Sequence, residues 1–389
     1  MSVAIIGVGL HPFGRFEGVS ALEMGAIASR RALADAGLRW DQVQLGVGGS
    51  LGVSLPDSHG DTMADSLVGP LGLTGVPFIN VANGCATAGT AISVAASAIE
   101  AGQADVVLAV GFDKHPRGHF NADPAVHGLQ PWYGELGMFV TTQFFAMKIN
   151  RYMHDHGISH DTLAKVAAKA FRNGTRNPNA WRRKPMSEDE ILSARMLNYP
   201  LTQYMFCSPG EGAGAVVLCR AEKVRELTDR TPIHLKGNTL RTRRFGTFEV
   251  FSPSLAPTWT DAPTVDASRA CYEQAGIGPS DVDVAQIQDS ESGAEIIHMA
   301  ENGFCEHGEQ EDLIQQGATD IGGSLPLNTD GGLLANGEPI AASGMRQVHE
   351  VVVQLRGEAG ERQVPNEPRV GYTQVYGAPG VAAVSILTR

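Results

Sequence analysis

Cysteine is scarce in this chain of 389 residues: five occur, at positions 85, 207, 219, 271 and 305. Their number is odd, their spacing is wide and no Cys-x-x-Cys pair is present, which argues against a disulfide framework and against a zinc site. We therefore expect a cytoplasmic protein without a bound metal. Long apolar runs are lacking too, and the N-terminus MSVAIIGVGLHPFG has no basic n-region. Neither a transmembrane helix nor a secretory signal is indicated.

Basic residues are outnumbered by acidic ones, 30 to 42, which gives a formal net charge of −12. This balance disfavours nucleic acid or an anionic membrane as the main partner. One segment departs from it, RNGTRNPNAWRRK at 172–184. Its basic residues form either an anionic ligand site or a solvated run of charge, and they are Arg172, Arg176, Arg182, Arg183 and Lys184.

The length of the chain favours two core-forming lobes. The segments ASRRALADAGLRWDQV (28–43) and ASRACYEQAGIGPSDV (267–282) begin alike, share an Ala-Gly pair and end in Val before an apolar stretch. Gly37 and Gly276 suit the left-handed position that ends a helix. We interpret the match as an internal duplication, with an N-terminal half at 1–250 and a C-terminal half at 251–389.

Short β-rich runs alternate with helical segments in both halves, which predicts α/β layers with one sheet per half. Expected strands lie at 3–9, 77–83, 104–112, 214–219, 233–238, 283–289 and 381–387, and expected helices at 20–36, 85–101 and 342–357. Residues 114–205 interrupt the first half. They are rich in His, Arg, Asn, Trp and Tyr, and we expect an inserted loop domain there.

Cys85 stands in VANGCATAGTA, between an expected strand and an expected helix. Free N–H groups and the positive end of the helix dipole favour a thiolate at such a place. An ordinary thiol, with a pKa of about 8.5, is only slightly ionised at neutral pH, so this placement would assist chemistry. The alternative is a small buried apolar side chain, which is the usual state of a cysteine.

Several motifs occur in the order typical of the thiolase superfamily. They are NGCATAG, GFDKHPRG (111–118), the stretch from RNPNA to CSPGEGAGAVVL (176–218), NTDGGLLANGEPIAASGMRQ (328–347) and VYGAPGVAAVSIL (375–387). The chain resembles sterol-carrier-protein-type thiolases and the bacterial lipid-transfer thiolase-like proteins of sterol side-chain breakdown. The resemblance spans nearly the whole chain. It implies a five-layered αβαβα fold with two similar halves, and so accounts for the duplication.

The resemblance assigns the nucleophile position of thiolases to Cys85, but two other motifs depart from the family. Gly337-Glu338-Pro339 stands where Gly-His-Pro is expected, and Gln288-Asp289-Ser290 where His-Asp-Cys is expected. Gln288 is neither acid nor base. Glu338 is either a base whose pKa burial raises or a surface or salt-bridged carboxylate, and Asp289 either orients a partner or caps a helix.

Tyr376 lies beside Gly377 in the motif that closes thiolase active sites with backbone donors. Some thiolase-like proteins are retro-aldolases, which cleave a 3-hydroxyacyl-CoA without an acyl-cysteine, and a tyrosine suits removal of the hydroxyl proton. The alternative for Tyr376 is a packed aromatic side chain bonded to backbone. Backbone donors near Cys85 and Gly380 are expected to stabilise the enolate.

Three functions therefore stand open: retro-aldol cleavage of a 3-hydroxyacyl-CoA, a Cys85-dependent 3-oxoacyl-CoA thiolase, and a weakened acyl-CoA-binding or scaffold subunit. CoA is expected as part of the substrate, with no tightly bound cofactor, and the basic segment at 172–184 is expected to contact its nucleotide end. The resemblance also implies a homodimer and a small OB-fold (DUF35-like) partner protein. Cys207 and Cys219 are interpreted as structural, and the histidines as part of a solvated loop rather than a metal site: His115, His119, His154, His156 and His160.

Overall fold

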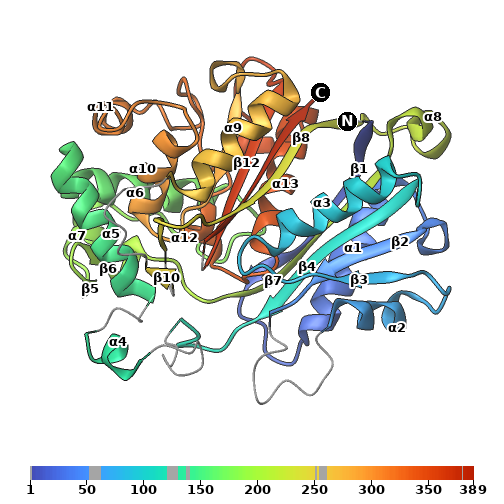
Figure 1. Ribbon diagram of the computed structural model, residues 1–389, viewed down its shortest axis with the longest axis horizontal. Coiled ribbons are helices and arrows are strands. Elements are labelled where there is room, and N and C mark those ends of the chain that lie inside the picture. The colour runs from blue at the N-terminus through green and yellow to red at the C-terminus, as the bar shows by residue number, and fades with distance from the viewer. Residues whose placement is uncertain are drawn as a thin grey trace.

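One mixed sheet joins the two halves of the chain (Figure 1). The computed structural model describes residues 2–51, 63–120, 130–136, 141–249, 252–253, 261–378 and 380–389. Within these ranges nine strands pair in the order β11-β12-β13-β8-β1-β7-β4-β2-β3. Their bounds are β1 Val3–Gly14, β2 Leu45–Gly49, β3 Phe78–Asn80, β4 Val106–Lys114, β7 Glu211–Arg220, β8 Ile233–Thr242, β11 Val284–Ile287, β12 Val370–Gly377 and β13 Val381–Thr388. Two small hairpins are β5 (Met196–Asn198) with β6 (Leu201–Thr202), and β9 (Phe248–Glu249) with β10 (Ser252–Pro253).

Strand β8 makes the sheet continuous, where the sequence predicted one sheet per half. It pairs antiparallel with β1 over Val3–Ile5 and with β13 along most of its length. The proposed boundary near residue 250 stays a prediction, and β8, which precedes it, is hydrogen-bonded to strands of both halves.

Helices form three layers around the strands. Helix α1 (Ala21–Ala36) covers the outer face of the first half, and α9 (Pro263–Ala275) covers that of the second. Between them α3 (Thr87–Glu100) and α13 (Ser343–Arg356) share one apolar core with strands of both halves. The strands are buried on both sides, which is why they are nearly continuous runs of Val, Ile, Leu, Ala and Gly. The five-layered αβαβα arrangement is confirmed.

The internal duplication is visible in the order of the elements. Helix α1 ends at Gly37 (φ 71°) and α9 at Gly276 (φ 66°), each in the left-handed conformation that glycine adopts without strain. A three-residue 3-10 turn follows in both places, at 40–42 and 279–281. The chain then enters β2 or β11.

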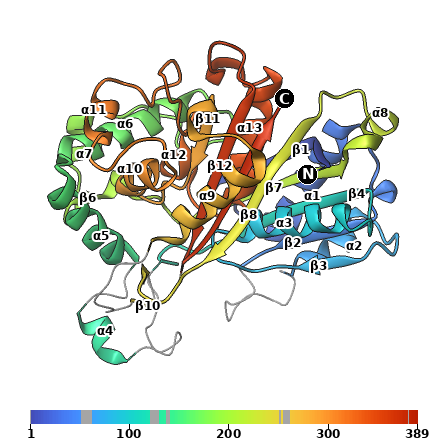
Figure 2. The same ribbon diagram turned by 45° about the horizontal axis from the view of Figure 1, so that its top comes forward.

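The inserted segment is more helical than expected. It holds two 16-residue helices, α5 (Thr141–His156) and α6 (His160–Thr175), with shorter α4 (Pro131–Glu135) and α7 (Glu188–Leu192). Helix α6 is amphipathic and buries an apolar stripe. The many polar residues and histidines of the segment made this stripe hard to recognise in the sequence. Figures 1 and 2 show α5, α6 and α7 beside α10 (Ser292–Glu301) and α11 (Gln310–Gln315), on the side of the molecule away from β3.

The remaining helices are short. They are α2 (Val68–Leu71), α8 (Val224–Leu227) and α12 (Gly332–Asn336). Among the helices of the described ranges, none has the length and apolar character needed to cross a bilayer.

Candidate functional site

The turn that carries Cys85 is fixed by its threonines and glycines. Thr87 Oγ1 accepts from Asn83 N and donates to Gly84 O, and Asn83 Nδ2 donates to Thr90 Oγ1 at 2.9 Å. Gly84 has φ +54°, and a Cβ there would lie 2.7 Å from Ala378 O. A Cβ on Gly377 would likewise lie 2.5 Å from Asn83 O. The bare glycines therefore let the β3–α3 turn touch the β12–β13 turn.

The Cys85 thiol is protonated rather than activated, which corrects the expectation from the helix dipole. Cys85 lies two residues before α3 and is half-buried. Burial raises its pKa well above the ordinary range, and the carboxyl of Glu338 raises it further by charge and by hydrogen bonding. These effects oppose ionisation and outweigh the end of the helix.

Glu338 is the centre of the site, not a surface carboxylate. It is 3 % exposed, and burial raises its pKa although its neighbours oppose the shift. Gln288 Nε2 donates to its Oε1 at 3.1 Å, and Cys207 Sγ donates to its Oε2 at 3.4 Å. Its backbone is held against the 208–210 segment by two hydrogen bonds. Cys207, interpreted from sequence as structural, therefore shares this carboxyl with Cys85.

His115 is buried in the site wall, so the solvated-loop interpretation was wrong for it. Its Nε2 lies 3.1 Å from Asp113 Oδ2, which also accepts from Ala341 N at 2.6 Å. The ring stacks on His119 with centroids 4.1 Å apart. Burial is the largest cause that lowers the pKa of His119 to about 4, so His119 is neutral at pH 7.

Asp289 and Gly380 hold backbone in place. Asp289 is buried, and its Oδ1 accepts from Leu333 N at 2.7 Å, so it caps α12. Gly380 (φ +114°) donates its N–H to Gly377 O at 2.8 Å, and a Cβ there would lie 2.8 Å from Glu249 Cγ. The Gly380 N–H is thus engaged within the hairpin rather than free to bind an oxyanion.

Tyr376 is bonded to a side chain, not to backbone. Its hydroxyl donates to Glu249 Oε2, and both residues are buried. Burial and the Glu249 carboxylate raise the pKa of Tyr376 well above the ordinary range, and Cys85 also contributes. Glu249 was missed, because a single glutamate in an apolar TFEVF stretch carries no motif. Lys148 Nζ, from α5, lies 5.7 Å from the centroid of the Tyr376 ring.

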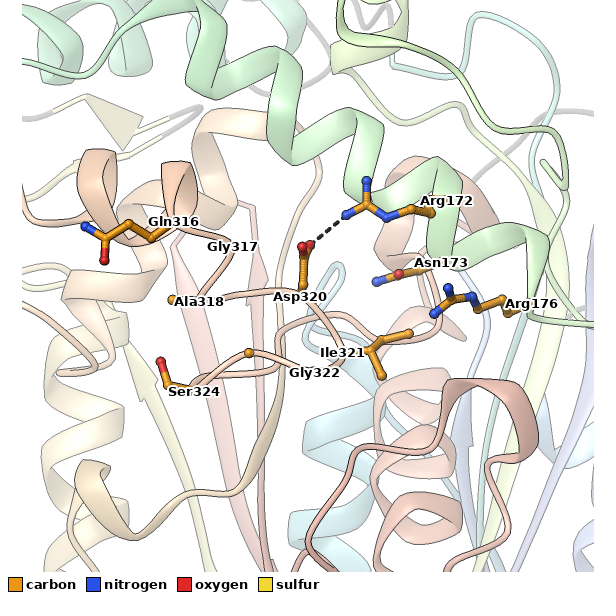
Figure 3. Close-up of a pocket in the computed structure, with 11 residues that line it drawn as sticks. Arg172, Asn173, Arg176, Gln316, Gly317, Ala318, Asp320, Ile321, Gly322 and Ser324 are labelled. Carbon is orange, nitrogen blue, oxygen red and sulfur yellow. Dashed lines mark hydrogen bonds and ion pairs between the residues drawn. The ribbon is translucent and has the colours of Figure 1, made fainter.

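The basic segment at 172–184 does not form one cluster. Arg172 and Arg176 line a cavity of about 570 Å³ against the 316–324 loop, and Arg172 pairs with Asp320 at 2.6 Å (Figure 3). Arg182 turns inward instead, where it donates to Leu334 O and to Ser208 Oγ. Its neighbours Arg183 and Lys184 are exposed.

The comparisons with known proteins agree with the motifs. Residues 3–191 match the thiolase N-terminal domain and residues 249–389 the thiolase C-terminal domain-like family. The chain is 34% identical to the acetyl-CoA acetyltransferase of Methanothermobacter thermautotrophicus, over 100% of this chain and 99% of that protein. It is 32% identical to the benzoylsuccinyl-CoA thiolase subunit BbsB of Thauera aromatica, over 96% and 94%. It is 31% identical to sterol carrier protein 2 of Oryctolagus cuniculus, over 99% and 71%.

Two solved structures share the fold. The Ltp2–ChsH2(DUF35) aldolase superposes with a TM-score of 0.83 at 25% identity and covers 100% of this chain and 97% of that one. A monomeric SCP2-thiolase-like protein type 1 from Mycobacterium smegmatis superposes with a TM-score of 0.71 at 18% identity, covering 100% and 77%.

Proposed function

We propose a reaction for this chain on the premise that it belongs to the thiolase superfamily and is an enzyme of acyl-CoA chemistry. The proposed reaction is the retro-aldol cleavage of 3-hydroxyacyl-CoA thioesters. One observation carries the proposal. The Cys85 thiol faces the carboxyl of Glu338, and this carboxyl raises the pKa of the thiol. The Tyr376 hydroxyl, in contrast, donates a hydrogen bond to the carboxylate of Glu249. The site is therefore arranged to move protons and not to form a thiolate.

The proposed cleavage begins at the substrate hydroxyl. Its proton passes to Tyr376 Oη while the phenol proton passes to Glu249, whose pKa burial raises above its ordinary value. The oxygen electrons form the new carbonyl as the Cα–Cβ bond breaks, and that electron pair becomes the thioester enolate. Glu338 in its protonated form then supplies a proton to Cα, which releases a shorter acyl-CoA and an aldehyde or ketone.

Acyl transfer through Cys85 is the second candidate. The retained cysteine and the 34% identity to an acetyl-CoA acetyltransferase favour it. It requires Cys85 to attack a thioester carbonyl as a thiolate, which burial and the Glu338 carboxyl oppose. The scaffold alternative is less favoured, because buried carboxyl groups without a catalytic use cost stability.

The proposed substrates carry lipid or sterol side chains on CoA. Arg176, Arg183 and Lys184 remain proposed contacts for the CoA phosphates, since their side chains are exposed. A site with two reduced thiols, Cys85 and Cys207, supports the proposed cytoplasmic location. The aldolase that resembles this chain is a complex with a DUF35 protein, and we extend that pairing to a small OB-fold partner here.

We further propose a homodimer through the edge of the sheet at β3. Among the strands of the described ranges, β3 ends the sheet and is paired on one side by β2, and Ile79 is 41% exposed on it. Beside it a cavity of about 300 Å³ is lined mostly by small and apolar residues of α3, including Val94 and Ser97, and by Ala101 just after the helix. Light scattering tests the proposal: wild type should be a dimer and Ile79→Lys a monomer, and a wild-type monomer of 41.2 kDa would contradict it.

Product identification tests the main proposal. The protein, alone and with its OB-fold partner, is incubated with 3-hydroxyacyl-CoAs or with 3-oxoacyl-CoAs and free CoA. Retro-aldol cleavage yields a free aldehyde or ketone from the first set. Acyl-CoA products from the second set, together with an acyl adduct on Cys85, would establish thiolysis instead.

A further inference from the structure

Lys148 of the inserted segment lies close to Tyr376, which with Glu249 forms the pair proposed to move the substrate proton. Its ammonium lies 3.8 Å from Glu301 Oε1 and 5.7 Å from the centroid of the Tyr376 ring. Helix α5 approaches α10 closely because residue 293 is glycine, where a Cβ would lie 2.2 Å from Ile149 Cγ1. The adjacent residue Lys148 is thereby brought over the site.

Three carboxyl groups act on this ammonium through their charge. Glu249 comes from β9, while Glu291 and Glu301 come from the start and the end of α10. Each is at most 9% exposed at its side chain or residue. Burial alone would lower the pKa of Lys148, but Glu301 first, and then Glu249 and Glu291 when ionised, raise it, so the ammonium stays charged. In return, Lys148 opposes the rise that burial imposes on the pKa of Glu249 and of Glu291.

Within the described residues, the other ionisable groups that act on this cluster are His298, Arg243, Cys85 and Asp289, the last of which opposes the ionisation of Glu291. His298 packs its ring 6.0 Å from that of Tyr376 and its Nε2 3.7 Å from Glu301 Oε2, and burial lowers its pKa, so it adds no charge at pH 7. Arg243, after β8, favours the ionised form of Glu249, and the Cys85 thiol faces Tyr376. Among the described residues that act on this cluster, Lys148 is the cation whose charge acts on all three carboxyl groups.

We propose that Lys148 is a positioning residue for the cleavage: its charge keeps Glu249 ionised, so that Glu249 accepts the proton relayed by Tyr376. The inference rests on the proposed function. It assigns the inserted helices a part in the chemistry, since α5 supplies the cation whose charge acts on all three carboxyl groups.

Removal of the charge should act through protonation. In Lys148→Met the carboxyl cluster loses its shared cation, so its members take up protons at higher pH. Lys148 Nζ lies 3.8 Å from Glu301 Oε1 and acts on Glu249 and Glu291 through its charge, and an opposite charge within about 4–6 Å shifts a pKa by about one to three. In the pH profile of kcat/KM, the loss of activity on the acid side (the acid limb) should therefore occur about one to three pH units higher. Activity should recover at alkaline pH. Lys148→Arg keeps the charge and should keep the wild-type limb.

Two readouts separate this inference from the proposed function. The first needs no substrate: infrared difference spectra of Lys148→Met should show the carbonyl stretch of a protonated carboxylic acid at pH 7, and this band should be lost in Lys148→Met/Glu249→Gln. The second is the pH profile of cleavage. Lys165→Met is the matched control, because Lys165 lies on the neighbouring α6 and donates to Gln315 O instead of pairing with these carboxylates.

The outcomes are distinct. A new acid band with no cleavage activity in any variant, wild type included, would keep the charge assignment and refute the aldolase. Cleavage by wild type with an unchanged limb and no acid band in Lys148→Met would overturn the inference. A limb that moves equally in Lys165→Met would also overturn it, because the effect would then be one of net charge.

Discussion

Replacement of Tyr376 by phenylalanine removes one hydroxyl and leaves the packing of the ring on Lys148 and His298 in place. If Tyr376 relays the substrate proton, cleavage should fall by about 10²–10⁴-fold, the range for a lost general base. This corresponds to about 3–5 kcal/mol in the barrier. The free energy of unfolding should fall by about 1–3 kcal/mol, because the buried Glu249 carboxyl is left without its donor.

Strand β12 offers a matched control four residues away. Tyr372 is fully buried, and its hydroxyl bonds Ser268 Oγ and Asn302 Oδ1, both at 2.8 Å. Tyr372→Phe should therefore cost about the same 1–3 kcal/mol of stability while cleavage continues at the wild-type rate. Chemical denaturation and steady-state kinetics on both variants separate the two effects. Equal rates in the two variants at equal stability would refute the role of Tyr376.

Three further outcomes follow from the same contacts. Cys85→Ala should retain most cleavage activity, and wild type should carry no acyl adduct by mass spectrometry. Glu338→Gln should lose activity, and an essential Cys85 would favour acyl transfer over retro-aldol cleavage. Iodoacetamide should label the two half-buried thiols, Cys85 and Cys305, before the buried three, and the rate should rise throughout pH 7–9 because the pKa of each lies above that range. Burial raises the pKa of Glu291 from 4.5 to about 8, so the folded chain keeps a proton that the unfolded chain releases; the free energy of unfolding should fall as pH rises between these values, and Glu291→Gln should flatten this part of the pH profile.

The layered fold could be predicted because local sequence and tertiary structure agree. Buried strands such as β4 and β13 are continuous apolar runs, and Gly37 and Gly276 end their helices as glycine usually does. Strand β12 was not identified as a separate strand, since GYTQVYG mixes polar and aromatic residues that only its buried position explains. Helices α5 and α6 were missed for a related reason: their polar faces carry the histidines that suggested a loop.

The site could be predicted only in part. Motif order placed Cys85, Glu338 and Tyr376, and the structure brings the first two into contact. The pKa of Cys85 could not be predicted, because the helix end is a local feature whereas the Glu338 carboxyl arrives from a segment about 250 residues later in the chain. Glu249 and Lys148 have no motif at all, and only the approach of α5 to α10 at Gly293 brings Lys148 to Tyr376.

Retention of a cysteine without an imidazole partner has a physical explanation within the proposed chemistry. The backbone at residue 85 is closely packed against the β12–β13 turn, since a Cβ on Gly377 would lie 3.1 Å from Cys85 N. The Cys85 side chain, a small and weakly polar thiol, offers one hydrogen bond to Glu338. With a histidine in place of Glu338, the thiol would share its proton with a base and ionise. With a buried carboxyl there, the thiol and the carboxyl oppose each other's ionisation, and the thiol, whose pKa is raised well above its ordinary value, keeps its proton. The exchange of one residue at position 338 therefore converts a nucleophile into a neutral neighbour of the general acid, and leaves the proton transfer at the substrate hydroxyl to Tyr376 and Glu249.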